Sequence, residues 1–312
     1  MGVLSDLRDP TTWGAKLIAG GLTLLVFLFL AVVAMSGFLL YRIVSPALTS
    51  SDLRAEDLPG NPSVVPFVAS GGKIREGWFF PGLKGAPTII LCHGYQSHRG
   101  EILTLVTALQ EHQFNVFVFD FAGHSTSRGF TTLGYGETRE LLAAVDAVAQ
   151  RDDVDRERFG VWGMNLGGYA ALAAAAANSH IRAVAVDSIY DEPSQMLRLL
   201  VERSGLGVLP LVGAFCRLEY KLANFTSRKE GPLSPRLNRL AGVAKLFIQA
   251  RDNPALAEST RELFLLSPEP RAQSIIPSSN YPAMMDEERR SYENQIINFF
   301  LQNLPPVSKP VH

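Results

Sequence analysis

The sequence predicts an α/β protein with a mostly parallel sheet, preceded by one membrane-spanning helix. Three features predict this class: a long uncharged stretch near the N-terminus, short continuous apolar runs beyond it, and amphipathic segments between those runs. Continuous apolar runs are typical of strands that are buried on both faces. Their alternation with helices is typical of a parallel sheet that helices cover on both sides. At 312 residues, the chain is long enough to bury a sizeable core.

The N-terminal apolar stretch has the length of a transmembrane helix, which we place at residues 17–43, after a short segment at 1–16. No charged residue lies between Lys16 and Arg42. About 25 residues at about 1.5 Å each exceed the hydrocarbon thickness of a bilayer. A cleaved signal peptide is the alternative, but its apolar region spans only about 7–15 residues and ends at a small-residue site, which this stretch lacks. We therefore expect a single-pass membrane protein.

The charges that flank this stretch do not indicate on which side of the membrane the large domain lies. Arg8 and Lys16 precede the stretch, and Arg42 and Arg54 follow it. The positive-inside rule therefore gives a tie, and the orientation stays open.

Charge and cysteine content exclude several other classes of protein. With a formal net charge of −1 and mixed charges, the chain has no basic stripe, so we expect no nucleic-acid partner. The two cysteines, Cys92 and Cys216, make neither a disulfide framework nor a zinc site. We expect both to be buried thiols; a bridge between them in an oxidising compartment is the alternative. We expect no metal and no other cofactor.

A proline-containing linker at 44–62 is followed by the predicted α/β domain at 63–304 and a tail at 305–312. The first two strands are expected to form an antiparallel hairpin around Gly71 and Gly72. The expected strands are Ser63–Val68, Lys73–Phe80, Pro87–Cys92, Asn115–Phe121, Phe159–Trp162, Ile181–Asp187, Val243–Ala250 and Ala272–Pro277. The expected helices are Glu101–His112, Glu137–Gln150, Tyr169–Ala177 and Asp286–Leu301.

The interval at about 189–240 interrupts this alternation and contains no clear strand. It is predicted to be an inserted helical cap over one end of the sheet. We interpret its apolar part, Leu197–Leu218 with Leu209 and Phe215, as the inner surface of the cap. Contact of this part with the bilayer or with a membrane partner is the alternative.

A sharp strand-to-helix turn is predicted after the strand that ends at Trp162. The segment Gly163-Met164-Asn165-Leu166-Gly167-Gly168 leads into an alanine-rich helix. Glycines suit a strained turn in which the strand and helix backbones approach closely. The turn also lies at the carboxyl end of a strand, which is where ligands bind in parallel sheets.

This turn resembles the G-x-S-x-G nucleophile elbow of the α/β-hydrolase superfamily, with Asn165 in place of the serine. Two further motifs carry the resemblance. Cys92–Tyr95 is similar to the His-Gly turn before the oxyanion loop, and Asp120–Gly129 is similar to the loop after the next strand, a pattern that Thr131–Gly134 and Glu137 continue. From about residue 63 to 304, the chain resembles membrane-anchored bacterial hydrolases related to serine aminopeptidases and carboxylesterases. The resemblance implies an α/β-hydrolase fold with a helical cap.

Two of the three catalytic positions that this resemblance implies lack their catalytic side chains. Asn165 takes the place of the serine, and its carboxamide is a poor nucleophile. The histidine position falls on Asn280 or, in another register, on Tyr281. No histidine lies between His180 and His312, so a shifted register does not restore the base. The triad is therefore expected to be degenerate.

The remaining positions match the family more closely. Asp252 follows a strand at the place of the triad acid, whereas Ala122 stands where the loop usually has an arginine. The backbone N–H groups of Tyr95 and Leu166 correspond to the oxyanion-hole donors. A change of side chain at the elbow need not disturb these donors. His93 and His124 are expected to lie beside them as further binding residues.

Two catalytic alternatives stay open. In the first, His93, His98 or His124 is the base and Ser125 or Ser127 is the nucleophile. In the second, Asn165 converts to aspartate, as in hydrolases with an aspartate nucleophile, although the histidine that activates water would still be missing.

The sequence therefore predicts a non-catalytic, membrane-anchored α/β-hydrolase-fold protein. Two roles are compatible with it: an accessory or scaffold subunit that binds a protein partner in a membrane complex, or a binder of an acyl or carboxylate small molecule. The alternative is an active hydrolase of esters or peptides that uses non-standard catalytic residues.

Overall fold

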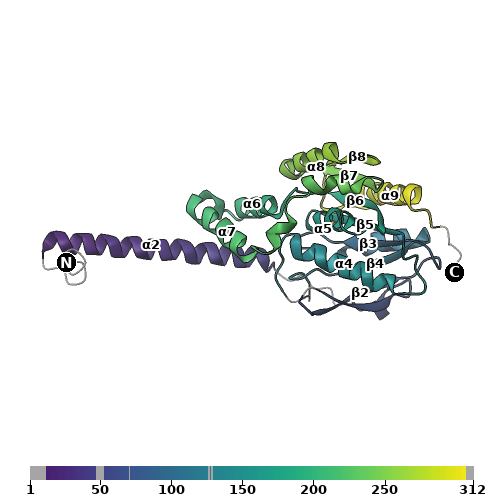
Figure 1. The fold of residues 1–312 in the computed structure, drawn as a ribbon, viewed down its shortest axis with the longest axis horizontal. Helices are drawn as coiled ribbons and strands as arrows, with labels where there is room; N and C mark the ends of the chain where they lie inside the picture. The colour runs from purple at the N-terminus through teal and green to yellow at the C-terminus, as the bar shows by residue number, and fades with distance from the viewer. Residues whose placement is uncertain (1–11, 47–52, 70, 126, 128, 307–312) are drawn as a thin grey trace. The chain divides into compact units, whose positions relative to one another are not determined.

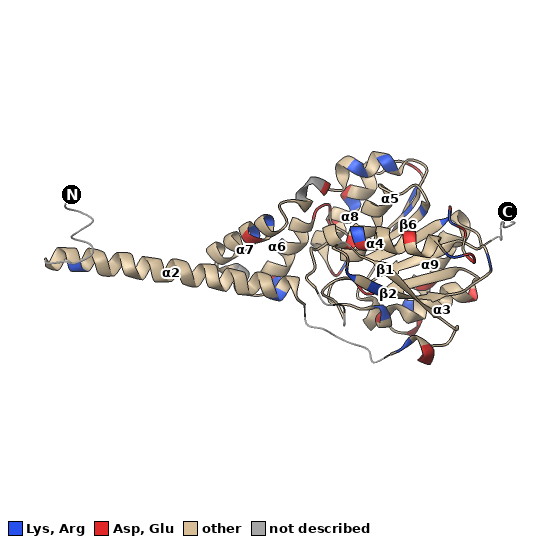
Figure 2. Cartoon of the chain, turned by 60° about the horizontal axis from the view of Figure 1, so that its bottom comes forward, with Lys and Arg blue, Asp and Glu red and all other residues tan. Residues whose placement is uncertain are grey.

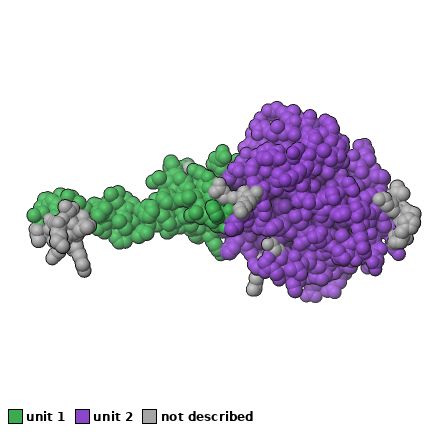
Figure 3. Space-filling model, viewed as in Figure 1, with its two compact units in different colours: residues 1–43, 197–225 green, residues 44–196, 226–312 purple. Residues whose placement is uncertain are grey.

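The computed structural model describes residues 12–46, 53–69, 71–125, 127 and 129–306, and Figure 1 labels the helices and strands. The chain forms two compact units, which Figure 3 colours separately. The smaller unit comprises the chain up to Ile43 together with Leu197–Phe225. The larger unit comprises Val44–Met196 and the chain from Thr226 onward.

The larger unit is built on an eight-stranded sheet with the strand order β1-β2-β4-β3-β5-β6-β7-β8. β2 pairs antiparallel with β1 and with β4, whereas all the other pairs are parallel. The predicted opening hairpin and the mostly parallel α/β class are therefore confirmed. The strands are β1 (Ser63–Val68), β2 (Ile74–Phe80), β3 (Thr88–Cys92), β4 (Asn115–Phe119), β5 (Phe159–Met164), β6 (Ile181–Asp187), β7 (Ala244–Ala250) and β8 (Arg271–Ile276).

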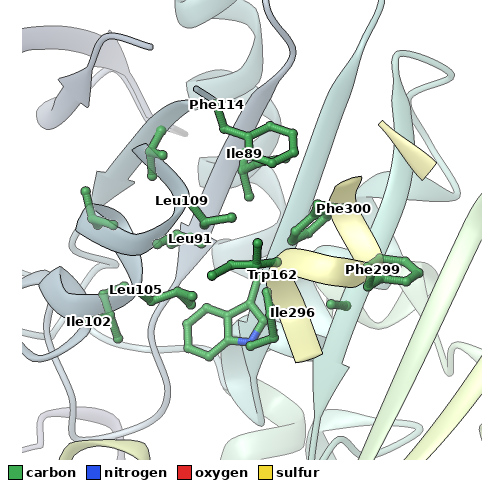
Figure 4. Close-up of a cluster of buried hydrophobic side chains, with 14 of the residues drawn as sticks. Ile89, Leu91, Ile102, Leu105, Leu109, Phe114, Trp162, Ile296, Phe299 and Phe300 are labelled. Atoms are coloured by element: carbon green, nitrogen blue, oxygen red, sulfur yellow. The ribbon is translucent and has the colours of Figure 1, made fainter. Parts of the chain in front are cut away.

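Helices form a layer on each side of this sheet. α3 (Leu103–Glu111) and α9 (Asp286–Asn303) share one core cluster with the strands, in which Ile89, Trp162 and Phe300 are fully buried (Figure 4). Three other helices also contact the strands or one another, and none of their residues belongs to that cluster. These helices are α4 (Tyr135–Ala149), α5 (Leu166–Ala175) and α8 (Pro254–Leu266). They form the second layer.

Helix α8, which follows β7, was not predicted. Its start nevertheless has an ordinary N-terminal signal, because Asn253 Oδ1 accepts a hydrogen bond from Leu256 N at 3.4 Å and Pro254 opens the helix. The interval 189–240 is helical and contains no strand, as expected. Its elements are α6 (Pro193–Arg203), α7 (Pro210–Ala223) and the 3-10 helices η3 (Leu206–Val208), η4 (Ser227–Glu230) and η5 (Ser234–Leu240).

The smaller unit contains the long N-terminal helix α2 (Trp13–Val44), which is long and apolar enough to cross a membrane. In Figure 2, α2 is free of charged residues over most of its length, with Lys16 and Arg42 towards its two ends. The helix begins at Trp13, four residues before the predicted span. This extension adds Lys16 and an exposed Trp13 to the helix.

Helix α7, in the same unit, packs against α2. Its Val212, Cys216 and Tyr220 are buried, whereas Leu211 and Leu218 are exposed. Leu209, just before the helix, is also exposed. The apolar segment Leu197–Leu218 therefore has a buried and an exposed side, because the helical repeat turns only one side of it inward.

Candidate functional site

Asn165 is the turning residue between β5 and α5. β5 ends at Met164 and α5 begins at Leu166, so the change of direction falls on Asn165, with φ 35° and ψ −98°. This backbone conformation is uncommon for a residue other than glycine. Asn165 N donates to Asp187 O at 2.8 Å, and Asn165 O accepts from Tyr169 N at 2.9 Å. These bonds hold the strained elbow in place with an asparagine at its apex.

Close approach of backbones explains the glycines around this turn. A Cβ atom on Gly163 would lie 2.4 Å from the backbone of Gly167, and one on Gly167 would lie 2.3 Å from Cys92 O. Neither position could accept a side chain without moving the main chain. A Cβ atom on Gly94 would lie 2.9 Å from Asn165 Nδ2, so the turn after β3 also runs close to the elbow.

The Asn165 side chain folds back onto the backbone of the site. Its Oδ1 accepts hydrogen bonds from Tyr95 N at 2.8 Å and from Leu166 N at 2.6 Å. The oxygen must point this way, because the amide nitrogen would place its own hydrogens against two N–H donors. Tyr95 and Leu166 are the residues whose N–H groups the sequence resemblance implies as oxyanion-hole donors. The Asn165 oxygen thus sits where the oxygen of an acyl ligand would be bound.

His93 is fully buried, and both of its ring nitrogens are occupied. Nε2 accepts from Phe121 N at 3.0 Å, so Nδ1 carries the proton and donates to Gly94 O at 2.8 Å. Burial lowers the pKa of His93 to about 4, so the ring is neutral near pH 7. His93 therefore joins the turn after β3 to the loop after β4 and has no free nitrogen with which to act as a base.

His124 lies next to His93 and Tyr95, with ring centroids 5.1 Å and 5.9 Å away. Its Nδ1 lies 3.1 Å from Ala122 O, and its buried Nε2 has no hydrogen-bond partner in the described part of the chain. Burial lowers the pKa of His124 to about 4. The structure therefore brings His93, Tyr95 and His124 together, as two neutral imidazoles beside the elbow loop.

Two other residues of the first catalytic alternative, His98 and Ser127, have structural partners. His98 Nδ1 accepts from Gly100 N at 3.1 Å and caps the short helix that follows. The Ser127 hydroxyl accepts a hydrogen bond from the Arg75 guanidinium. Ser125 is buried, with a φ of 51°. A guanidinium cannot remove a proton from Ser127, so these contacts do not favour a serine–histidine pair in this loop.

The loops after β7 and β8 meet at Asp252. Asp252 Oδ2 accepts from Ser278 Oγ at 2.7 Å and from Ser279 N at 3.2 Å. Asn280 N donates to Ser278 Oγ at 3.1 Å, and the Asn280 side chain is exposed. A serine hydroxyl thus bonds to the carboxylate that would orient a histidine in the serine mechanism.

Tyr281, the other candidate for the histidine position, is fully buried in the core. Its hydroxyl donates to Glu293 Oε1 at 2.5 Å and lies 2.6 Å from Thr104 Oγ1. Its ring centroid lies 5.9 Å from that of Trp162. Of the two candidates, only Asn280 remains on the exposed loop beside Asp252.

Arg75 on β2 is a residue of this region that the sequence did not indicate. Its Nε donates to Glu140 Oε1 at 2.9 Å, and Glu140 Oε2 accepts from Ala122 N at 2.9 Å. Burial raises the pKa of Glu140 to about 7, although the Arg75 charge opposes the rise. Arg75 thus places a guanidinium next to Ala122, where the family pattern has an arginine in the loop itself.

Asp187, the last residue of β6, is a second residue that the sequence reasoning missed. Its carboxylate accepts from Ser188 Oγ at 2.8 Å and from Tyr292 OH at 2.9 Å, and Tyr292 OH accepts from Trp162 Nε1 at 3.2 Å. Asp187 is fully buried, and this burial raises its pKa to about 7. A charged residue at the carboxyl end of a predicted buried strand was the signal that could have identified it.

Both cysteines, Cys92 and Cys216, are free and buried. Among the described residues, no three or more His, Cys, Asp or Glu side chains gather into a group that could hold a metal ion.

Comparisons with known proteins agree with this architecture. A family model for the alpha/beta hydrolase fold matches residues 87–209, which contain the elbow and the loops around it. The protein YfhR of Salmonella typhimurium is 31% identical over 198 residues, which cover 58% of this chain and 67% of that protein. The chain belongs to the α/β-hydrolase family. YfhR of Escherichia coli O157:H7 is 27% identical over 257 residues, covering 80% of this α/β-hydrolase and 84% of that protein.

A solved structure similar to this α/β-hydrolase is the esterase Pf2001 of Pyrococcus furiosus. The TM-score is 0.66 at 18% sequence identity, with 84% of this chain and all of that chain covered. At this identity the similarity establishes the shared fold and carries no activity over to this chain.

Proposed function

We propose that this protein is a membrane-anchored, non-catalytic α/β-hydrolase that serves as an accessory or scaffold subunit of a membrane complex. The observation that carries the proposal is the pair of hydrogen bonds from Tyr95 N and Leu166 N to Asn165 Oδ1. Asn165 thereby supplies no nucleophile and also fills the donors that would stabilise an oxyanion.

The lack of a suitable general base is the second argument for a non-catalytic role. Serine chemistry in this fold needs a histidine that takes the nucleophile's proton. His93 uses both ring nitrogens for backbone contacts, and Asp252 bonds to Ser278 and Ser279. His124 has an unbonded Nε2, but burial lowers its pKa to about 4, so it is a weak base. These contacts support a protein that lacks the nucleophile, the base and the oxyanion hole of the family's usual reaction.

The same geometry favours a scaffold over a binder of acyl or carboxylate ligands. Such a ligand would have to displace the Asn165 oxygen from both N–H groups, which are already satisfied. Each exchanged hydrogen bond contributes only about 1 kcal/mol net, so the ligand would gain little from these donors. The architecture of the sheet and loops then remains as a surface for protein contacts.

Helix α2 supports the membrane part of the proposal. It is 32 residues long, and no residue of its most apolar window is buried within the protein. A helix of this length and hydrophobicity is stable when lipid covers it. We propose that it is a permanent single-pass anchor.

Activity measurements on the full-length protein in detergent micelles test the non-catalytic role. We expect no labelling by a fluorophosphonate probe and no cleavage of short p-nitrophenyl esters, while an active serine esterase in the same detergent serves as the positive control. Labelling that survives Asn165→Ala would reveal another nucleophile and would overturn the proposal.

Purification from native membranes under mild detergent distinguishes the two non-catalytic roles. A scaffold is expected to co-purify with a protein partner at a fixed ratio. Recovery of a bound small molecule without a protein partner would favour the ligand-binding role instead.

A further inference from the structure

Helices α7 and α2 belong to the smaller unit, which Figure 3 shows in green, and their contacts include an apolar and a polar one. The Phe215 and Phe29 rings meet edge to face, with centroids 5.6 Å apart and an interplanar angle of 77°. Ser36 Oγ donates to Glu219 Oε1 at 2.7 Å. Interhelical hydrogen bonds occur in helix packing inside membranes, and ionisable side chains at such depth face a neighbouring helix, as Glu219 faces α2.

The position of Phe29 sets the depth of this contact. Phe29 lies near the middle of α2, which runs from Trp13 to Val44. At about 1.5 Å per residue, it lies roughly 20 Å along the helix axis from Arg42, well inside a hydrocarbon layer of about 30 Å. When α2 crosses a bilayer, the Phe215 side chain therefore lies at the depth of the acyl chains.

The chain that leads into α7 has the composition required at that depth. The thirteen residues from Ser204 to Cys216 include no charged residue, and Arg203 and Arg217 flank them. Val208 is 81% exposed and Leu211 is 63% exposed. Leaving such apolar area in water costs about 25 cal/mol per Å², a cost that hydrocarbon removes. The exposed apolar side chains of this unit continue at Leu218 and Leu222 of α7 and at Phe225 just after it.

The backbone of this segment is suited to a lipid environment. Leu209 N donates to Leu206 O at 3.0 Å in η3, and Gly213 N donates to Leu209 O at 3.2 Å in the first turn of α7. Pro210 opens α7 and has no N–H to leave unsatisfied. A helical turn that satisfies its own backbone groups can enter hydrocarbon, which an irregular loop exposed to lipid cannot.

We propose that residues 204–216 form a re-entrant tip that enters the acyl-chain region beside α2 without crossing the bilayer. The proposal rests on the membrane anchoring by α2 proposed above. It gives the protein two membrane contacts: a spanning helix and a hairpin tip packed against it. The occupant of the exposed apolar surface is lipid, because the surface continues directly from the helix that lipid surrounds.

Site-directed fluorescence in vesicles tests this proposal. The full-length protein carries an environment-sensitive thiol dye at a cysteine introduced by Leu211→Cys or, independently, by Val208→Cys. Leu25→Cys on α2 is the reference for the bilayer interior, and Asp152→Cys, a fully exposed position on the larger unit, is the reference for water. The native cysteines are buried, and the unsubstituted protein gives the background labelling. Phosphatidylcholine vesicles with and without a spin label in the acyl chains are compared.

We expect the dye at Leu211→Cys and Val208→Cys to be quenched by the acyl-chain spin label by a factor similar to that at Leu25→Cys. Water-like emission without quenching at both tip positions, with Leu25→Cys still quenched, would overturn the re-entrant tip and leave the anchor intact. Loss of quenching at Leu25→Cys as well would contradict the anchor itself. Blue-shifted emission at the tip that the spin label does not quench would also overturn the proposal, in favour of burial against a second copy or a protein partner.

Discussion

Asn165 Oδ1 accepts a hydrogen bond from the backbone N–H of Tyr95 at 2.8 Å, although 70 residues separate the two in the sequence. This bond ties the turn after β3 to the elbow after β5. The same oxygen accepts from Leu166 N, the first N–H of helix α5, where a negative or partly negative group is favoured. The asparagine therefore acts as a structural clamp at the point where an active hydrolase binds its substrate.

The first prediction is that removal of this clamp destabilises the protein. Asn165→Ala leaves two N–H groups without their partner, and we expect it to lower the free energy of unfolding by about 1–3 kcal/mol. Asn165→Asp is the matched control, because its carboxylate keeps an acceptor for both donors at a helix N-terminus. Thermal unfolding of both variants in detergent provides the measurement. An alanine variant as stable as the wild type would show that the two bonds do not stabilise the elbow.

The second prediction concerns restoration of the nucleophile. Asn165→Ser replaces the carboxamide with a hydroxyl, but no described imidazole near the elbow has a free, basic nitrogen, since burial lowers the pKa of His93 and of His124 to about 4. We expect p-nitrophenyl ester turnover to stay at the level of the buffer. Turnover close to that of an active esterase would mean that a base exists outside the positions considered.

The strands and the elbow could be predicted from the sequence because their causes are local. Continuous apolar runs such as Ile181–Asp187 are buried on both faces, and the glycine pattern around Asn165 follows from close backbone approach. Helix α8 was missed although Asn253 and Pro254 mark its start. The sequence therefore contains a local signal from which this helix could be predicted.

The contacts that define the site could not be predicted, because residues distant in sequence form them. Nothing in the pattern around Ala122 indicates that Arg75 on β2 supplies the guanidinium beside it. The sequence also left the histidine position open between Asn280 and Tyr281. Packing distinguishes the two side chains, since Tyr281 is buried with Glu293 and Trp162 in the core and Asn280 is exposed.

The third prediction concerns the buried ion pair of Arg75 and Glu140. The Arg75 and Glu140 side chains are only 8% and 7% exposed, so loss of one partner leaves a buried group uncompensated. We expect Arg75→Met to cost about 3 kcal/mol in unfolding free energy, and Arg75→Met with Glu140→Gln to cost less than the sum of the two single changes. Chemical denaturation of the four proteins measures this coupling. Strict additivity would contradict a direct pairing.

The fourth prediction is a pH dependence of stability that originates at Asp187. Burial raises the pKa of this carboxyl group from 3.8 to about 7, so the folded state favours the protonated form. Between about pH 4 and pH 7, Asp187 loses its proton in the unfolded chain but keeps it in the folded protein. The free energy of unfolding therefore falls as the pH rises through this range. Above about pH 7, Asp187 is ionised in both states, so its contribution to the free energy of unfolding no longer changes with pH.

Asp187→Asn removes this titration and leaves the other groups in place, so the two proteins are compared at each pH. We expect the wild type to lose stability relative to the variant between about pH 4 and pH 7, on the order of a few kcal/mol, as measured by thermal unfolding. A stability difference between wild type and Asp187→Asn that does not change with pH would show that Asp187 is ionised throughout, held by the hydroxyls of Ser188 and Tyr292.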